Sequence, residues 1–297
     1  MKKISYVILA LLTVSCTRND MKYDASGTFE ATEITVSAET QGKLLFLNCD
    51  EGTKLKKGEV VACVDTVQTY LQKLQLEASN KAVVSKKSDI NKQIAAQKEE
   101  IKKQKRELKR YQELMLHGAA TDKQVDDLSA QLKVLERRLQ ATLSTLNNGN
   151  SSLTAESSAL DIQVARLNDL LNKSQIKAPV DGTVLAKYTE ANEIVNMGAP
   201  IFKIADLRQM FLRCYVTSKQ LADIKVGQSV KVISDYGDDI QKTYNGTISW
   251  ISDTSEFTPK SIQTDDDRGD LVYAVKVAVK NDGLLKIGMY GWIKFKS

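Results

Sequence analysis

The stretch RYQELMLHGAATDKQVDDL, residues 110–128, decides how most of this chain folds. A long charged, leucine-bearing segment stops at Gly118, and leucines at the same spacing resume a few residues later. Glycine favours a turn. Thr121 is suited to cap a returning helix, and Asp122 or Gln124 can help to satisfy the free N–H groups of its first turn. The sequence therefore predicts two helices joined by a tight turn.

Apolar residues recur every seven positions on both sides of this turn. Such a repeat indicates supercoiled helices, and two arms of equal length with a short connection most simply form an antiparallel hairpin. Each arm of about 50 residues would reach roughly 75 Å. The first arm carries Ile94, Ile101, Leu108 and Met115, with Ile90 and Tyr111 in the alternate position; the second carries Leu132, Leu139, Leu146, Leu153, Leu160 and Leu167, with Leu128, Leu135 and Leu170 in the alternate position.

One part of the second arm is a weak helix former. Residues 147–152 read NNGNSS, and Gly149 costs about 1 kcal/mol relative to alanine in a helix. Because the leucine repeat continues across this segment in register, we expect a weakened helix and not a break. The hairpin is then either a simple two-helix arm or one with an extra joint near Gly149.

Three β-rich segments flank the helical part. GKLLFLNCDEGTKLKKGEVVACVD and GTVLAKYTEANEIVNMGAPIFKIAD share one plan of strands and glycine turns, which predicts a β-sandwich of the biotinyl/lipoyl type. Short strand-like runs after it predict a small β-barrel. The expected fold is mixed α and β and elongated, a lipoyl-like sandwich split by a coiled-coil hairpin. The expected parts are a lipoprotein signal peptide (1–15), an N-terminal linker and first strand (16–33), the first sandwich half (34–65), the hairpin (66–175, tip about 117–121), the second half (176–206) and the barrel (207–297).

The N-terminus MKKISYVILALLTVSC reads as an export signal, because its apolar run is too short to span a bilayer. A cysteine after a small residue at the end of such a run resembles a bacterial lipobox, although Thr13 stands where leucine is usual. If the site is used, Cys16 becomes the acylated first residue. The alternative is a plain secretory signal in which Cys16 is lost or incidental.

Charge and chemistry exclude most enzyme classes. The chain has a net charge of +5, with lysines concentrated in the first arm, and a single histidine. It shows no nucleophile–base pair, metal-ligand spacing or phosphate loop, so we expect no catalytic residues, no metal and no cofactor. Cys49 and Cys63 lie in one predicted hairpin, where they form either a disulfide or two small buried side chains.

The whole arrangement resembles the periplasmic adaptor proteins of the HlyD/AcrA/MacA type, also called membrane fusion proteins. The segment KAPVDGTV at 177–184 and the hairpin tip carry the resemblance. It implies that the tip docks on a TolC-like outer-membrane channel through Arg110, Leu114, Thr121 and Asp126. The alternative is that Arg110 is solvated, Leu114 packs in the seam and Thr121 is only a cap.

The resemblance also implies partners and a location. An inner-membrane transporter would bind the adaptor, which would form a homo-oligomer, six copies in the family, in the periplasm and anchored by lipid to the inner membrane. The chain ends directly after the expected barrel, as in short adaptors without a clear membrane-proximal domain, and this favours an ABC-type transporter over a proton-driven one. Lipoylation is not expected, because neither Asp65 nor Asp206 is followed by a lysine.

Two other functions compete with the adaptor. A carrier domain of an acyl- or carboxyl-transfer enzyme lacks its target lysine here, and the export signal argues against it. A basic coiled-coil protein of the envelope would use the lysine-rich first arm to bind an anionic polymer. Nucleic acid is not an expected partner, because the basic stretch lacks interleaved aromatic residues and export removes the chain from the cytoplasm.

Overall fold

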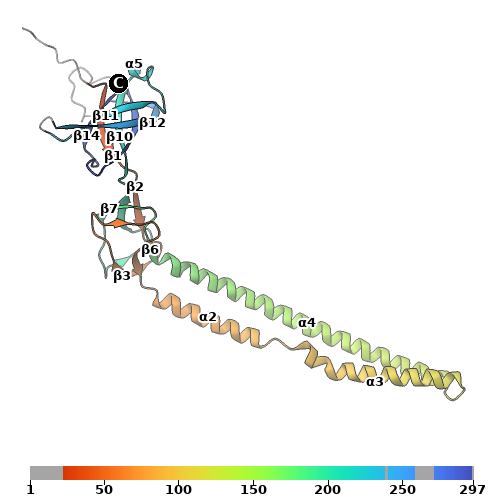
Figure 1. Cartoon of the computed structure of the whole chain (residues 1–297). Helices are drawn as coiled ribbons and strands as arrows, with labels where there is room; N and C mark the ends of the chain where they lie inside the picture. Colours follow the sequence, from red (N-terminus) through yellow and green to blue (C-terminus); the bar gives the residue numbers. More distant parts are fainter. Residues whose placement is uncertain (1–22, 238–239, 258–270, 296–297) are drawn as a thin grey trace, which may run out of the picture.

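The computed structural model describes residues 23–237, 240–257 and 271–295. They form an elongated molecule with three parts in a row: a β-barrel, a small β-sandwich beside it, and a long helical hairpin that projects from the sandwich (Figure 1). The mixed, elongated fold predicted from the sequence is confirmed. The expected signal peptide and Cys16 lie outside the described residues.

Six strands close the barrel in the order β1-β10-β13-β12-β11-β14. Every second residue of β10 is buried, from Met210 to Val216, because successive side chains of a strand point to opposite faces of the sheet. A short helix, α5 (Ser218–Leu221), follows β10. The barrel strands are β1 (Ala25–Glu30), β10 (Gln209–Thr217), β11 (Ser229–Asp235), β12 (Gln241–Phe257), β13 (Leu271–Lys280) and β14 (Tyr290–Lys294).

Strand β1 joins the barrel from the far end of the chain. It pairs with β10 on one side and with β14 on the other. The backbones approach closely at Gly27, where a Cβ atom would lie 1.9 Å from the carbonyl oxygen of Arg213. The barrel expected over residues 207–297 is therefore completed by a strand that the sequence placed ahead of the sandwich, within residues 16–33.

The sandwich consists of two four-stranded sheets, ordered β2-β9-β7-β4 and β6-β5-β3-β8. Each sheet takes two strands from each half of the motif. Replacing β2, β3, β4 and β5 by β6, β7, β8 and β9, and the reverse, converts one strand order into the other, so the two halves are related by an internal pseudo-twofold. The strands are β2 (Glu33–Ser37), β3 (Gly42–Leu47), β4 (Lys54–Leu55), β5 (Val60–Val64), β6 (Gln175–Lys177), β7 (Gly182–Lys187), β8 (Ile194–Val195) and β9 (Pro200–Ala205).

The hairpin has one interrupted arm and one continuous arm (Figure 1). The first arm comprises α2 (Val67–Ser85) and α3 (Ile90–Leu116), and the second is α4 (Asp122–Lys173). The seven-residue repeats face the partner arm, with Ile94, Ile101 and Leu167 buried. Helix α4 runs without a break through Gly149, so the interruption lies in the opposite arm, where the sequence predicted none.

None of the helices in the described part of the chain combines the length and apolar character needed to cross a membrane.

Candidate docking site at the hairpin tip

The turn after α3 is closed by a pair of backbone hydrogen bonds. The Gly118 N–H donates to the carbonyl of Met115 at 3.0 Å, and the Ala119 N–H donates to that of Leu114 at 2.9 Å. This pairing is a Schellman motif, which satisfies carbonyls that would otherwise be free at the helix end. It requires a left-handed residue, and Gly118 has φ +70. The glycine in the tip sequence is thus what ends the first arm.

Helix α4 begins with a capping box. The Thr121 hydroxyl accepts from the Gln124 N–H at 3.4 Å, and the Gln124 side chain accepts from the Thr121 N–H at 2.9 Å. Asp122 adds a negative charge in the first turn, where the helix dipole favours it. Only three residues therefore separate the two caps, His117 and Thr121, so the tip is a short turn fixed at both ends.

Arg110 and Leu114 lie one helical turn apart near the end of α3. The Arg110 guanidinium is 3.5 Å from Glu107 and lies over the Tyr111 ring at 5.6 Å, yet 63% of its side chain is exposed. Such an exposed ion pair holds the side chain only weakly. Leu114 is 36% exposed. Both side chains are available for a contact at the tip.

Leu116 is the most exposed large apolar residue of the tip, at 80%, and sequence reasoning missed it. At 100° per residue, Leu114 and Leu116 fall on either side of Met115, which lies half-buried towards the other arm. The run Leu-Met-Leu could have signalled this, because only one of three consecutive helical residues can face the seam. The tip thus presents two leucines on opposite flanks.

The four expected docking residues come from both arms. Arg110 and Leu114 lie in the last two turns of α3, whereas Thr121 caps α4 and Asp126 is exposed in its second turn. The Thr121 oxygen is already engaged in the cap. The tip therefore offers a leucine flanked by a cation, a second leucine, and an acidic position on the returning helix. This surface suits an end-on protein contact.

Two polar clusters lie away from the tip. In the sandwich, Lys187 contacts Asp50 at 2.8 Å and Glu190 at 2.9 Å, and hydrogen bonds to both carboxylates raise the pKa of the ammonium.

Cys49 is buried and Cys63 half-buried, and both are free thiols whose pKa values are raised by burial. No group of three or more His, Cys, Asp or Glu residues able to hold a metal occurs within residues 23–237, 240–257 and 271–295.

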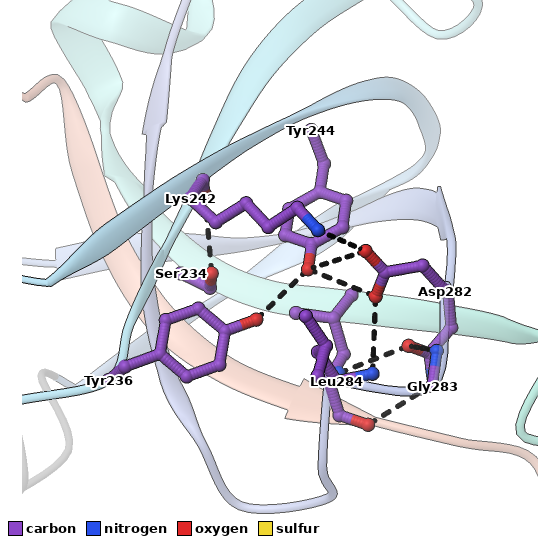
Figure 2. A network of polar contacts seen from close by, with 9 residues as sticks. Ser234, Tyr236, Lys242, Tyr244, Asp282, Gly283 and Leu284 are labelled. Atoms are coloured by element: carbon purple, nitrogen blue, oxygen red, sulfur yellow. Dashed lines mark hydrogen bonds and ion pairs between the residues drawn. The ribbon is translucent and has the colours of Figure 1, made fainter.

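In the barrel, Tyr244 lies at the centre of a network that joins the start of β12 to the loop after β13 (Figure 2). Its hydroxyl is 2.9 Å from that of Tyr236 and donates to Asp282 at 3.2 Å, and the Lys242 ammonium contacts the same carboxylate at 2.5 Å. Lys242 lowers the pKa of Asp282, while burial raises the pKa of Tyr244. This cluster ties two loops together at one end of the barrel.

Sequence comparison finds a relative of nearly the same extent. The chain is 27% identical over 291 residues to the UPF0194 membrane protein YE2891 of Yersinia enterocolitica, covering 91% of this chain and 88% of that protein. No family model matches the sequence.

Comparison of structures finds the same architecture in adaptor proteins. A MacA–MexA chimera containing the Pseudomonas aeruginosa MexA α-hairpin domain has a TM-score of 0.55 and 21% identity, covering 92% of this chain and 80% of the chimera. The resemblance to the HlyD/AcrA/MacA-type periplasmic adaptors is confirmed at the level of the fold. MacA from Actinobacillus actinomycetemcomitans has a TM-score of 0.51 and 21% identity (91% of this chain, 76% of MacA). The membrane fusion protein Spr0693 of Streptococcus pneumoniae also scores 0.51, at 18% identity (92% and 97%). The adaptor fold thus extends over nearly the whole chain.

Proposed function

We propose that this protein is a non-enzymatic periplasmic adaptor of a tripartite efflux or secretion system. It links an inner-membrane transporter to a TolC-like outer-membrane channel, and a lipid on Cys16 anchors it to the inner membrane. The transporter supplies the energy that moves the substrate, and the adaptor connects the transporter to the channel. The transporter in this proposal is of the ABC type, and six copies of the adaptor complete the assembly.

The observation that carries this proposal is the tip of the hairpin. A turn of three residues between two capped helices holds Leu114 and Leu116 outward. Exposed leucines at the end of a long rod have no role in the core of the monomer, and removing them from water on a partner would favour binding. Arg110 beside them adds a directional polar contact. The tip is therefore the surface we assign to the outer-membrane channel.

The length of the hairpin suits a bridge. Helix α4 has 52 residues, which corresponds to about 78 Å at the rise of an α-helix. It starts at the tip and ends beside the sandwich, so the tip lies far from the sandwich and the barrel (Figure 1). A contact made at the tip is thereby separated from the rest of the molecule by the length of the hairpin.

The experiment is an in-cell photo-crosslink from a probe at Lys123, followed by identification of the captured protein. Lys123 is exposed in the first turn of α4, whereas Gln124 beside it is needed for the capping box. We expect an outer-membrane channel in the crosslinked product. Capture of this chain alone, or of soluble proteins only, would contradict the proposal.

A matched pair of substitutions tests whether the exposed leucines make the contact. Leu116→Asp should abolish the crosslink to the channel, because a carboxylate would be desolvated in an apolar contact. Val134→Asp is the control, since Val134 is 64% exposed on α4 several turns from the tip. Both variants should keep the helical circular dichroism of the wild type. Equal loss of crosslinking in both variants would show that Leu116 does not make a specific contact with the channel.

A further inference from the structure

The interruption of the first arm has an ordered geometry. Helix α2 ends in two tight turns, with the Lys86 N–H donating to Val83 at 3.1 Å and the Lys87 N–H donating to Val84 at 3.2 Å. Helix α3 then begins with Asp89 as its N-cap. Helix α4 passes the same level without a break (Figure 1). The segment 86–89 contains no glycine or proline, so neither of these helix-breaking residues accounts for the break.

One side chain from the opposite arm fills the gap. Asn150 on α4 accepts a hydrogen bond from the Ser88 N–H at 2.9 Å and donates one to the Ser88 carbonyl at 2.9 Å. Both backbone groups of Ser88 are therefore satisfied by a single amide, as a neighbouring strand would satisfy them. Asn150 lies within the weak NNGNSS segment, so this segment has a role in tertiary structure.

The spacing of inward residues explains why the break lies here. Asn80 and Val83 lie three residues apart, Ile90 and Ile94 lie four apart, and all four are buried or half-buried. In an unbroken helix the same alternation of three and four between Val83 and Ile90 would place Lys87 inward. An unbroken helix would thus direct an ammonium into the seam opposite Asn150, at a high desolvation cost. In the structure Lys87 is exposed and Ser88 takes the inward place.

The two halves of the first arm bury different amounts of apolar side chain. On the tip side, α3 buries Ile94 and Ile101, whereas on the base side α2 buries the smaller Val83. On the base side, Asn80 donates to Asp161 at 2.6 Å and accepts from Ser157 at 2.7 Å. Exchange of such hydrogen bonds for bonds to water costs little free energy, whereas exposing buried apolar residues costs more. Separating α2 from α4 therefore costs less free energy than separating α3 from α4.

We propose that residues 86–89 form a hinge in the first arm and that Asn150 holds this hinge closed. When the two bonds to Ser88 break, α2 moves away from α4 while α3 and the tip remain paired with it. The hairpin then changes its angle to the sandwich without loosening the tip. This inference rests on contacts within the hairpin and does not depend on the proposed bridging function.

Hydrogen exchange of the full chain, followed by mass spectrometry, tests the hinge. In Asn150→Ala we expect exchange to rise about tenfold across α2, residues 67–85, with α3 unchanged. Asn148→Ala is the matched control, because Asn148 is exposed two residues away on the same helix, and it should leave both helices unchanged. A rise confined to residues 88–89, or one of equal size in α3, would overturn the proposal.

A second variant should slow hydrogen exchange at the hinge instead of raising it. Lys87→Leu with Asn150→Leu places two leucines at the inward positions and removes the reason for the break, so exchange in segment 86–89 should slow to the rate of α3. If this double variant exchanges as fast as the wild type in that segment, the hinge is not set by these two residues and the inference fails.

Discussion

The amide nitrogen of Ala119 lies 2.9 Å from the carbonyl oxygen of Leu114, and this bond turns the chain from one arm of the hairpin into the other. It forms only while Gly118 keeps its positive φ. The turn therefore depends on one residue that has no side chain to contribute, and its energetic role can be tested by adding a single methyl group.

Gly118→Ala should destabilise the hairpin by about 1 kcal/mol, because an L-residue is strained at positive φ although no atom lies within 4 Å of the added Cβ. Gly149→Ala is the same change in the middle of α4, where the space is also open, and it should stabilise the helix by a similar amount. Thermal unfolding followed by helical circular dichroism should therefore shift in opposite directions. Shifts of the same sign would show that the turn geometry is wrong.

Substitutions at Thr121 should separate the cap from any docking contact of the hydroxyl. Thr121→Ala should cost about 1 kcal/mol, and Thr121→Ser should cost little, since serine caps as well as threonine. Thr121→Asn also caps the helix but has no hydroxyl. If its stability matches that of the wild type and the channel crosslink from Lys123 persists, the residue acts only as a cap. Loss of the crosslink in this variant alone would assign the hydroxyl to docking.

The network around Tyr244 in the barrel predicts that the stability of the fold depends on pH. The Lys242 ammonium holds the pKa of Asp282 below its usual range, so the carboxylate stabilises the fold above the unfolded pKa of about 4, and this contribution is lost as the pH falls through the folded pKa. Asp282→Asn should lower the melting temperature at pH 7. The difference in melting temperature between this variant and the wild type should become smaller below about pH 4. A difference independent of pH would mean that the charge of Asp282 is not involved.

Closure of the barrel should be sensitive to a single methyl group on β1. Gly27→Ala should destabilise the barrel by at least about 2 kcal/mol, because the added Cβ would meet the backbone of Arg213. Ser26→Ala, the neighbouring residue on the same strand, provides the control. Urea unfolding monitored by tryptophan fluorescence suits the measurement, since Trp292 lies opposite Ser26 on β14. Equal midpoints for the two variants would contradict the closing role of β1.

Local signals in the sequence predicted most of this fold. The heptad repeats faced the seam as expected, and the paired glycine turns marked both halves of the sandwich, because a side chain's environment in a regular element follows its spacing. The pairing of β1 with β10 could not be predicted in this way. It joins Gly27 to Cys214 across most of the chain, and a six-residue strand carries no sign of its partner.

The hinge and the second leucine of the tip were missed for different reasons. The break at residues 86–89 has no glycine or proline, and it follows from the charge of Lys87 at an inward position opposite Asn150, which requires the register between the arms. Leu116 lies outside the seven-residue repeat and was therefore not singled out. Its exposure follows from its angular position on α3, and that could have been calculated from the sequence.

The hairpin leaves and re-enters the sandwich at two adjacent strands, with Cys63 of β5 paired to Gln175 of β6. In the topology of the sandwich, the whole hairpin is therefore a long connection between the neighbouring strands β5 and β6. Adding or removing one heptad from each arm would change the reach of the tip by about 10 Å and leave the seam in phase. The hairpin can thus be lengthened, shortened or exchanged as a unit, so that the same sandwich and barrel can carry a tip at different distances.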